Sequence, residues 1–151
     1  MRIVRGDLLH LARQGDFDVI IHGCNCQCAM GKGIALAIKQ QFPAAYAADL
    51  ATAKGSAAKL GTYSSASLET DAGTLTIVNA YTQFHWNGPG VKVDYDAIHR
   101  VMRAIAHDFA TARIGYPKIG AGLAGGDWSV ISAIFDTELE GLDHTYVDFA
   151  G

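Results

Sequence analysis

The stretch DVIIHGCNCQCAMGKGIA, residues 18–35, joins an apolar run to a glycine-rich turn and then to a helical pattern. The apolar run at 19–21 is continuous, which is typical of a strand buried on both faces. After the turn, Ile34 and Ile38 recur at helical spacing. A strand that enters a helix through a glycine-rich loop is a building block of α/β folds.

The rest of the chain alternates in the same way. Strands are expected at 2–5, 18–22, 63–66, 74–81, 114–116 and 144–149. Helices are expected at 33–42, from 43 to about 53, at 95–109 behind the cap Asp94, and from the cap Asp127 to about 139. This alternation predicts an α/β layered sandwich with ligand sites at the carboxyl ends of the strands.

Composition and charge indicate one globular domain over residues 1–151. Half of the residues are hydrophobic and 18% are charged, which excludes intrinsic disorder. No apolar stretch approaches the roughly 18 residues of a membrane span. The net charge is −3 and no block of Lys or Arg occurs, which argues against extended nucleic-acid binding. The first residues show no signal-peptide pattern, so we expect a cytoplasmic protein.

A second glycine-rich stretch, IGAGLAGGDW at 119–128, also lies between an expected strand and an expected helix. Loops that enter helices point unpaired N–H groups outward, and the helix dipole favours an anion there. Two such loops at one sheet edge could hold a diphosphate from both sides. The alternative is that both are ordinary tight connections. Neither loop has the spacing of a Walker A or a dinucleotide-binding motif.

Three cysteines, Cys24, Cys26 and Cys28, alternate in the first loop. In an extended chain they would share one face with His22, and such a set would suit zinc. The run has no second ligand pair at zinc-site spacing, and an odd number of cysteines is a poor disulfide framework. We therefore expect buried free cysteines and no metal.

Four segments together resemble the macrodomain, a module that binds ADP-ribose: residues 6–9, 18–25, 30–35 and 117–123. They occur in the family's order and spacing, so the resemblance covers the whole chain. It implies a three-layer α/β/α sandwich with a mixed central sheet. Within the family, the segment from Ile21 to Cys26, followed by the Gly-x-Gly-Ile-Ala segment from Gly31 to Ala35, is most similar to the ADP-ribose-1″-phosphate phosphatases.

The resemblance also implies binding roles. Asp7 and Leu8 would recognise adenine, Phe149 would pack near it, and Asn25 would position the distal ribose. The diphosphate would lie between two sets of backbone amides, namely Gly31, Lys32, Gly33 and Ile34 on one side and Gly120, Ala121, Gly122, Leu123 and Ala124 on the other. Structural alternatives remain open, because Asp7 could cap a turn, Asn25 could be a turn residue and Phe149 could belong to the core.

Three residues are candidates for catalysis. His22 stands where the phosphatase branch carries a histidine, and an imidazole that titrates near neutrality can transfer protons. Asp127 could hold the attacking water, and Asn25 would fix the ribose. A core histidine and a helix cap are the alternative roles of His22 and Asp127. Water would be the nucleophile, and no cofactor is expected.

Two positions depart from the branches that remove ADP-ribose from proteins or DNA. Gln83 follows Thr82 where those relatives carry a lysine, and Ala124 stands where one branch has an aspartate. The sequence therefore favours an ADP-ribose-binding hydrolase that removes the 1″-phosphate from ADP-ribose-1″-phosphate. The alternatives are a non-catalytic ADP-ribose reader and a hydrolase of adducts on DNA or protein or of O-acetyl-ADP-ribose. We expect a monomer whose partner is a small ADP-ribose derivative, without a membrane.

Overall fold

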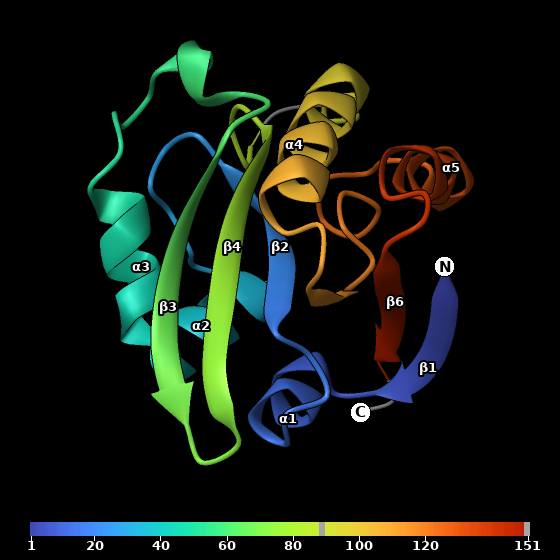
Figure 1. Ribbon diagram of the computed structural model, residues 1–151. Helices are drawn as coiled ribbons and strands as arrows, with labels where there is room; N and C mark the ends of the chain where they lie inside the picture. The colour runs from blue at the N-terminus through green and yellow to red at the C-terminus, as the bar shows by residue number, and fades with distance from the viewer. Residues whose placement is uncertain (88–89, 150–151) are drawn as a thin grey trace.

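The computed structural model describes residues 1–87 and 90–149 (Figure 1). Within these residues one mixed sheet has the order β1-β6-β5-β2-β4-β3, and all neighbours are parallel except β3 and β4. The strands are β1 (Arg2–Gly6), β2 (Val19–Asn25), β3 (Tyr63–Thr70), β4 (Gly73–Gln83), β5 (Arg113–Tyr116) and β6 (Asp143–Phe149). The carboxyl ends of five strands therefore meet at one edge.

Helices cover both faces of the sheet, which confirms the three-layer α/β/α architecture (Figure 1). The helices are α1 (Leu8–Arg13), α2 (Gly33–Gln41), α3 (Pro43–Leu50), α4 (Tyr95–Asp108) and α5 (Trp128–Glu138), with a short 3₁₀ helix η1 (Ala57–Lys59). The first three pack on one face, and α4 and α5 pack on the other.

The central strand β2 is apolar on both faces because both faces are covered. Ile20 packs toward α1, α2 and α3, whereas Val19 and Ile21 pack toward α4 and α5. Successive side chains of a strand point to opposite faces, so a strand between two helical layers needs a continuous apolar run. The run that predicts this strand is thus explained by its position in the sheet.

Helix α4 begins directly after Asp94, the N-cap residue that the sequence predicts. The Asp94 carboxylate accepts the N–H of Ala97, and Ile98, Met102 and Ile105 are buried at helical spacing. An apolar stripe of this spacing binds a surface helix to the sheet. The same reasoning holds at α5, where Asp127 is the cap.

The structure differs from the sequence-based expectation at two helices. Residues 8–13 form α1, which was not predicted, and α3 ends at Leu50 rather than near residue 53. At the end of α3, the Thr52 hydroxyl donates to the Asp49 carbonyl at 2.6 Å, which satisfies an acceptor that a longer helix would use. Among the described residues, no helix is both long and apolar enough to cross a bilayer.

Candidate functional site

The residues expected to bind a ligand come together at the carboxyl edge of the sheet. Asn25 pairs in register with Gln83 at the ends of β2 and β4, and Gly6 pairs with Phe149 at the ends of β1 and β6. Asp7 follows directly after β1. Parallel strands bring these chain-distant positions to one edge, which is where ligand sites lie in α/β sheets.

The two glycine-rich loops approach each other at this edge. A Cβ placed on Gly33 would lie 3.9 Å from Leu123 Cδ1, so the start of α2 faces the tip of the second loop. Gly33 and Gly120 have φ of 58° and 75°, which side chains rarely adopt. Leu123 is 71% exposed. The start of α2 and the tip of the second loop therefore face each other, and we call these two segments the walls of the expected site.

The wall formed by α2 has free backbone donors. Lys32 occupies the N-cap position of this helix, and its side chain makes no capping hydrogen bond. Gly31 and Lys32 are exposed. Because the first N–H groups of a helix have no intrahelical acceptor, this end of α2 is suited to an anionic ligand.

The second loop is held in shape by its own backbone. The Gly126 N–H donates to the Gly120 carbonyl at 2.7 Å, and the Ala124 carbonyl accepts the N–H of Lys92 at 2.8 Å. Ala121 is half-buried, Gly122 is exposed and Ala124 is buried. The loop is thus anchored at Gly120 and Ala124 and presents residues 121–123 outward.

Asn25 shapes the first loop. Its amide donates to the Ala29 carbonyl at 2.9 Å, and its Oδ1 accepts the N–H of Gln27 at 2.9 Å. The side chain is buried. An amide has two N–H donors, so one remains for a ligand after these bonds are made. Asn25 therefore stabilises a turn, which is one of its two expected roles, and its remaining N–H is free for the other role, which is to bind a ligand.

His22 lies beneath this edge rather than on it. The ring is 0% exposed, its Nε2 donates to Asn79 Oδ1 at 2.7 Å, and Cys24 Sγ lies 3.5 Å from Nε2. Burial lowers the pKa of His22 to about 4, although the bond to Asn79 opposes the shift. At neutral pH the ring is therefore uncharged and enclosed.

Asp127 is exposed at the start of α5. Its carboxylate accepts the backbone N–H and the hydroxyl of Ser129 at 2.9 and 2.7 Å. These hydrogen bonds lower the pKa of Asp127, so the carboxylate is ionised at neutral pH. Its capping role is present, and its exposure leaves it accessible to water.

We expect Asp127→Ala to lower the melting temperature by roughly 2–4 °C, because a helix loses its cap. Asp127→Asn should melt close to wild type, since asparagine also caps helices well. Thermal unfolding followed by circular dichroism checks both. Equal melting of the alanine variant and wild type would contradict a stabilising cap.

The expected adenine end contains Asp7, Leu8 and Phe149. Asp7 Oδ1 accepts the N–H groups of Leu9 and His10, so it caps α1. Leu8 is buried, whereas Phe149 is 70% exposed. Phe149 pairs with Gly6, the residue before Asp7, so an exposed ring and a carboxylate both lie at this end of the sheet and could offer a stacking surface and an acceptor to a base.

The three cysteines are free and buried. Burial raises the pKa of the Cys24 and Cys26 thiols, with nearby Asp49 adding to the effect. Among residues 1–87 and 90–149, no group of three or more His, Cys, Asp or Glu side chains is arranged to hold a metal. Cys24 lies near the end of β2, and Cys26 and Cys28 lie in the first loop.

Sequence reasoning missed several polar residues under the site. Asn79 binds His22, and Lys59 is buried below the first loop. The Thr82 hydroxyl is buried without a partner in the described part of the chain, and a Cβ on Gly23 would come within 2.9 Å of it. No local pattern marks such residues, because their partners lie far along the chain.

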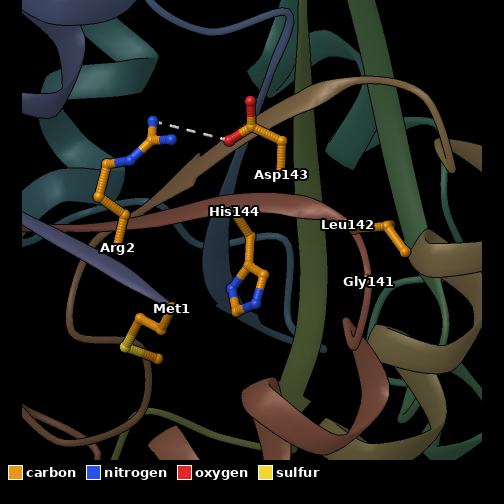
Figure 2. A pocket seen from close by; sticks show the side chains of 6 residues that line it. All are labelled: Met1, Arg2, Gly141, Leu142, Asp143 and His144. Carbon is orange, nitrogen blue, oxygen red and sulfur yellow. Dashed lines mark ion pairs between the residues drawn. The ribbon is translucent and has the colours of Figure 1, made fainter.

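A separate pocket of about 440 Å³ lies at the opposite edge, where β1 and β6 begin (Figure 2). Figure 2 shows Arg2 paired with Asp143 across its rim, 3.8 Å apart, and His144 below them. It contains no residue of the glycine-rich loops. The expected site and this pocket are therefore distinct.

Comparison with known proteins agrees with the geometry. The Macro domain family profile matches residues 21–135. An uncharacterised 17.5 kDa protein of Enterobacteria phage T4 is 34% identical over 99% of this chain and 96% of its own length. A DNA ADP-ribosyl glycohydrolase of Mycobacterium bovis is 30% identical over 82% of this chain but only 34% of its own length.

A shorter match is to a relative named for a different activity. An ADP-ribose 1″-phosphate phosphatase of Neosartorya fischeri is 50% identical over 44 residues, which are 29% of this chain and 20% of that protein.

Two solved structures share the fold. The macrodomain of Mycobacterium tuberculosis DarG has a TM-score of 0.71 at 22% identity and covers 97% of this chain and 96% of that one. Thermosipho africanus DarTG, solved in complex with ADP-ribose, has a TM-score of 0.72 at 18% identity and covers 97% of this chain and 40% of that one. With its family match, its six-stranded sheet and its two opposed glycine-rich loops, this chain belongs to the macrodomain family.

Proposed function

We propose that this macrodomain binds ADP-ribose along the carboxyl edge and hydrolyses the 1″-phosphate of ADP-ribose-1″-phosphate. The observation that carries the proposal is the approach of the two loops at Gly33 and Leu123, beside the uncapped start of α2. Such preorganised amides suit a diphosphate. The partial match to the fungal phosphatase supports the reaction.

In the proposed complex each part of the ligand meets a different strand end. The diphosphate lies between residues 31–34 and 120–124. Adenine lies beside Asp7 and Phe149, and the distal ribose takes the remaining N–H of Asn25. The ligand would run from adenine at β1 and β6, which lie at one end of the sheet, to the distal ribose at the central strand β2.

The proposed reaction needs a water and an acceptor for its proton. The water oxygen attacks phosphorus, the bond from phosphorus to the 1″ oxygen breaks, and this oxygen leaves as the hydroxyl of ADP-ribose after it gains a proton. Asp127 is ionised and exposed, so it can orient the water. His22 remains a candidate, but its burial and lowered pKa make Asp127 the more accessible of the two.

A second candidate is removal of ADP-ribose from DNA. It is favoured by the mycobacterial glycohydrolase, whose match covers 82% of this chain against 29% for the phosphatase. The identity of residue 83 argues against this reaction, because Gln83 stands where such relatives carry a lysine. The Gln83 amide instead donates to the His85 carbonyl. Glutamine cannot form a Schiff base.

Phosphate release from ADP-ribose-1″-phosphate, without added metal, tests the proposal. We expect turnover by wild type and a loss of roughly 100-fold in kcat/KM for Asn25→Ala, because a misplaced ribose moves the scissile bond. Asp127→Asn keeps the cap, so lost turnover in this variant would assign its carboxylate to the reaction. His22→Ala, measured beside it, tests the buried ring.

Calorimetric titration with ADP-ribose provides the control for binding. Tight binding without phosphate release would overturn the phosphatase proposal. An ADP-ribosylated oligonucleotide would then separate the two remaining possibilities, since a glycohydrolase would release free ADP-ribose from it and a non-catalytic reader would not.

A further inference from the structure

A buried lysine lies directly beneath the first loop. Lys59, at the end of η1, is only 6% exposed, although lysine is almost always at the surface. Its Nζ donates to the Cys26 carbonyl at 3.3 Å and lies 3.6 Å from Cys28 Sγ. It also lies 4.5 Å from the centre of the Tyr81 ring. The ammonium thus contacts the loop on both sides of Gln27.

The loop that Lys59 contacts carries Asn25. The Cys26 carbonyl accepts a second hydrogen bond, from the Gly55 N–H at 2.7 Å. Cys28 has φ of 55°, and no other non-glycine residue in the described part of the chain has a positive φ. A side chain in this conformation is strained, so the surrounding contacts must hold it. Lys59 is one of those contacts.

A second buried ionisable side chain, Asp49, contacts the same Tyr81 side chain as Lys59. Asp49 is 1% exposed, and its carboxylate accepts the Tyr81 hydroxyl at 2.7 Å. The Asp49 carbonyl accepts the Cys28 thiol at 3.2 Å. The side chains of Lys59 and Asp49 therefore both contact Tyr81, and the Lys59 side chain and the Asp49 backbone both contact Cys28. Burying two ionisable side chains is costly compared with apolar packing, so Lys59 is expected to have a role in positioning the loop that it contacts.

We propose that Lys59 is a positioning residue, which sets the conformation of the Asn25 loop so that Asn25 can hold the distal ribose. The inference rests on the proposed ADP-ribose site and adds a residue that favours ligands with a distal ribose over ligands without one. Lys59 touches no part of the ligand and acts through the Cys26 carbonyl. The diphosphate wall at the start of α2 is anchored separately, because Ile38 and Phe42 pack into the core.

The test compares two ligands that share adenosine and the diphosphate, of which only ADP-ribose carries the distal ribose. In Lys59→Met, ADP-ribose should bind roughly tenfold more weakly, while ADP should bind within about twofold of wild type. A merely structural role would weaken both ligands alike. Isothermal titration calorimetry measures the affinities. Lys54→Met is the matched control, because Lys54 is exposed close to the same loop and should bind both ligands like wild type.

The double variant Lys59→Met/Asp49→Asn removes both buried charges and keeps an acceptor for Tyr81, so it guards against unfolding caused by an unbalanced Asp49. It should show the same selective loss. Equal affinities for the variants and wild type, or equal losses for both ligands, would overturn the role of Lys59. If wild type failed to bind ADP-ribose, the proposed function would fail and this inference with it.

Discussion

Replacing Gly126 with alanine is expected to destabilise the protein by about 3 kcal/mol and to open the second loop. A Cβ at this position would lie 2.6 Å from the Gly120 carbonyl oxygen and 2.6 Å from Val93 Cγ1. The carbonyl cannot retreat without losing the hydrogen bond that it accepts from the Gly126 N–H. No side-chain rotation relieves the contact with the carbonyl oxygen, so the backbone must move.

Two measurements check this result. The melting temperature should fall by roughly 10 °C for a chain of this size. ADP-ribose affinity should fall roughly 100-fold as the diphosphate wall shifts. Gly122→Ala is the matched control for stability, because a Cβ there meets no atom within 4 Å. Equal melting temperatures for the Gly126→Ala and Gly122→Ala variants would contradict the prediction, because the loop would then accommodate the methyl group without strain.

Acid should begin to destabilise the protein near pH 6.5, before most carboxylates titrate. The pKa of His22 is about 4 in the folded protein, and an exposed histidine has a value near 6.5. As the pH falls from about 6.5 to 4, His22 becomes protonated in the unfolded chain but stays neutral in the folded protein. The unfolded state is therefore favoured, and His22 removes about 3 kcal/mol of stability across this window.

Urea unfolding at intervals between pH 7 and pH 4 measures the effect. His22→Gln should flatten the dependence, because glutamine does not titrate and can still donate to Asn79. His144→Gln is the comparison, since burial and the nearby amino terminus also lower the pKa of His144. The opposite result, an unchanged slope in His22→Gln, would mean that the buried ring is not the group that titrates.

Much of the fold follows from local patterns. The apolar run at 19–21, the helical repeat of Ile98, Met102 and Ile105, and the caps Asp94 and Asp127 all predicted elements that the structure confirms. Helix α1 was missed because six residues are too few for its period to stand out. Its cap, Asp7, is an expected adenine ligand with a turn cap as the alternative, and the structure shows that Oδ1 accepts the N–H groups of Leu9 and His10.

The sequence alone determined the layered α/β class, the two glycine-rich loops and the family. Hydrophobic periodicity, turn residues and motif spacing are local properties, so each can be recognised within a short segment. Only the tertiary structure decided that the loops face each other at Gly33 and Leu123, that His22 is enclosed, and that Lys59 is buried. His22 meets Asn79 across 57 positions, and Lys59 meets Cys26 across 33. Such partners are chosen by the order of strands in the sheet, and strand order depends on long-range packing that no local pattern records.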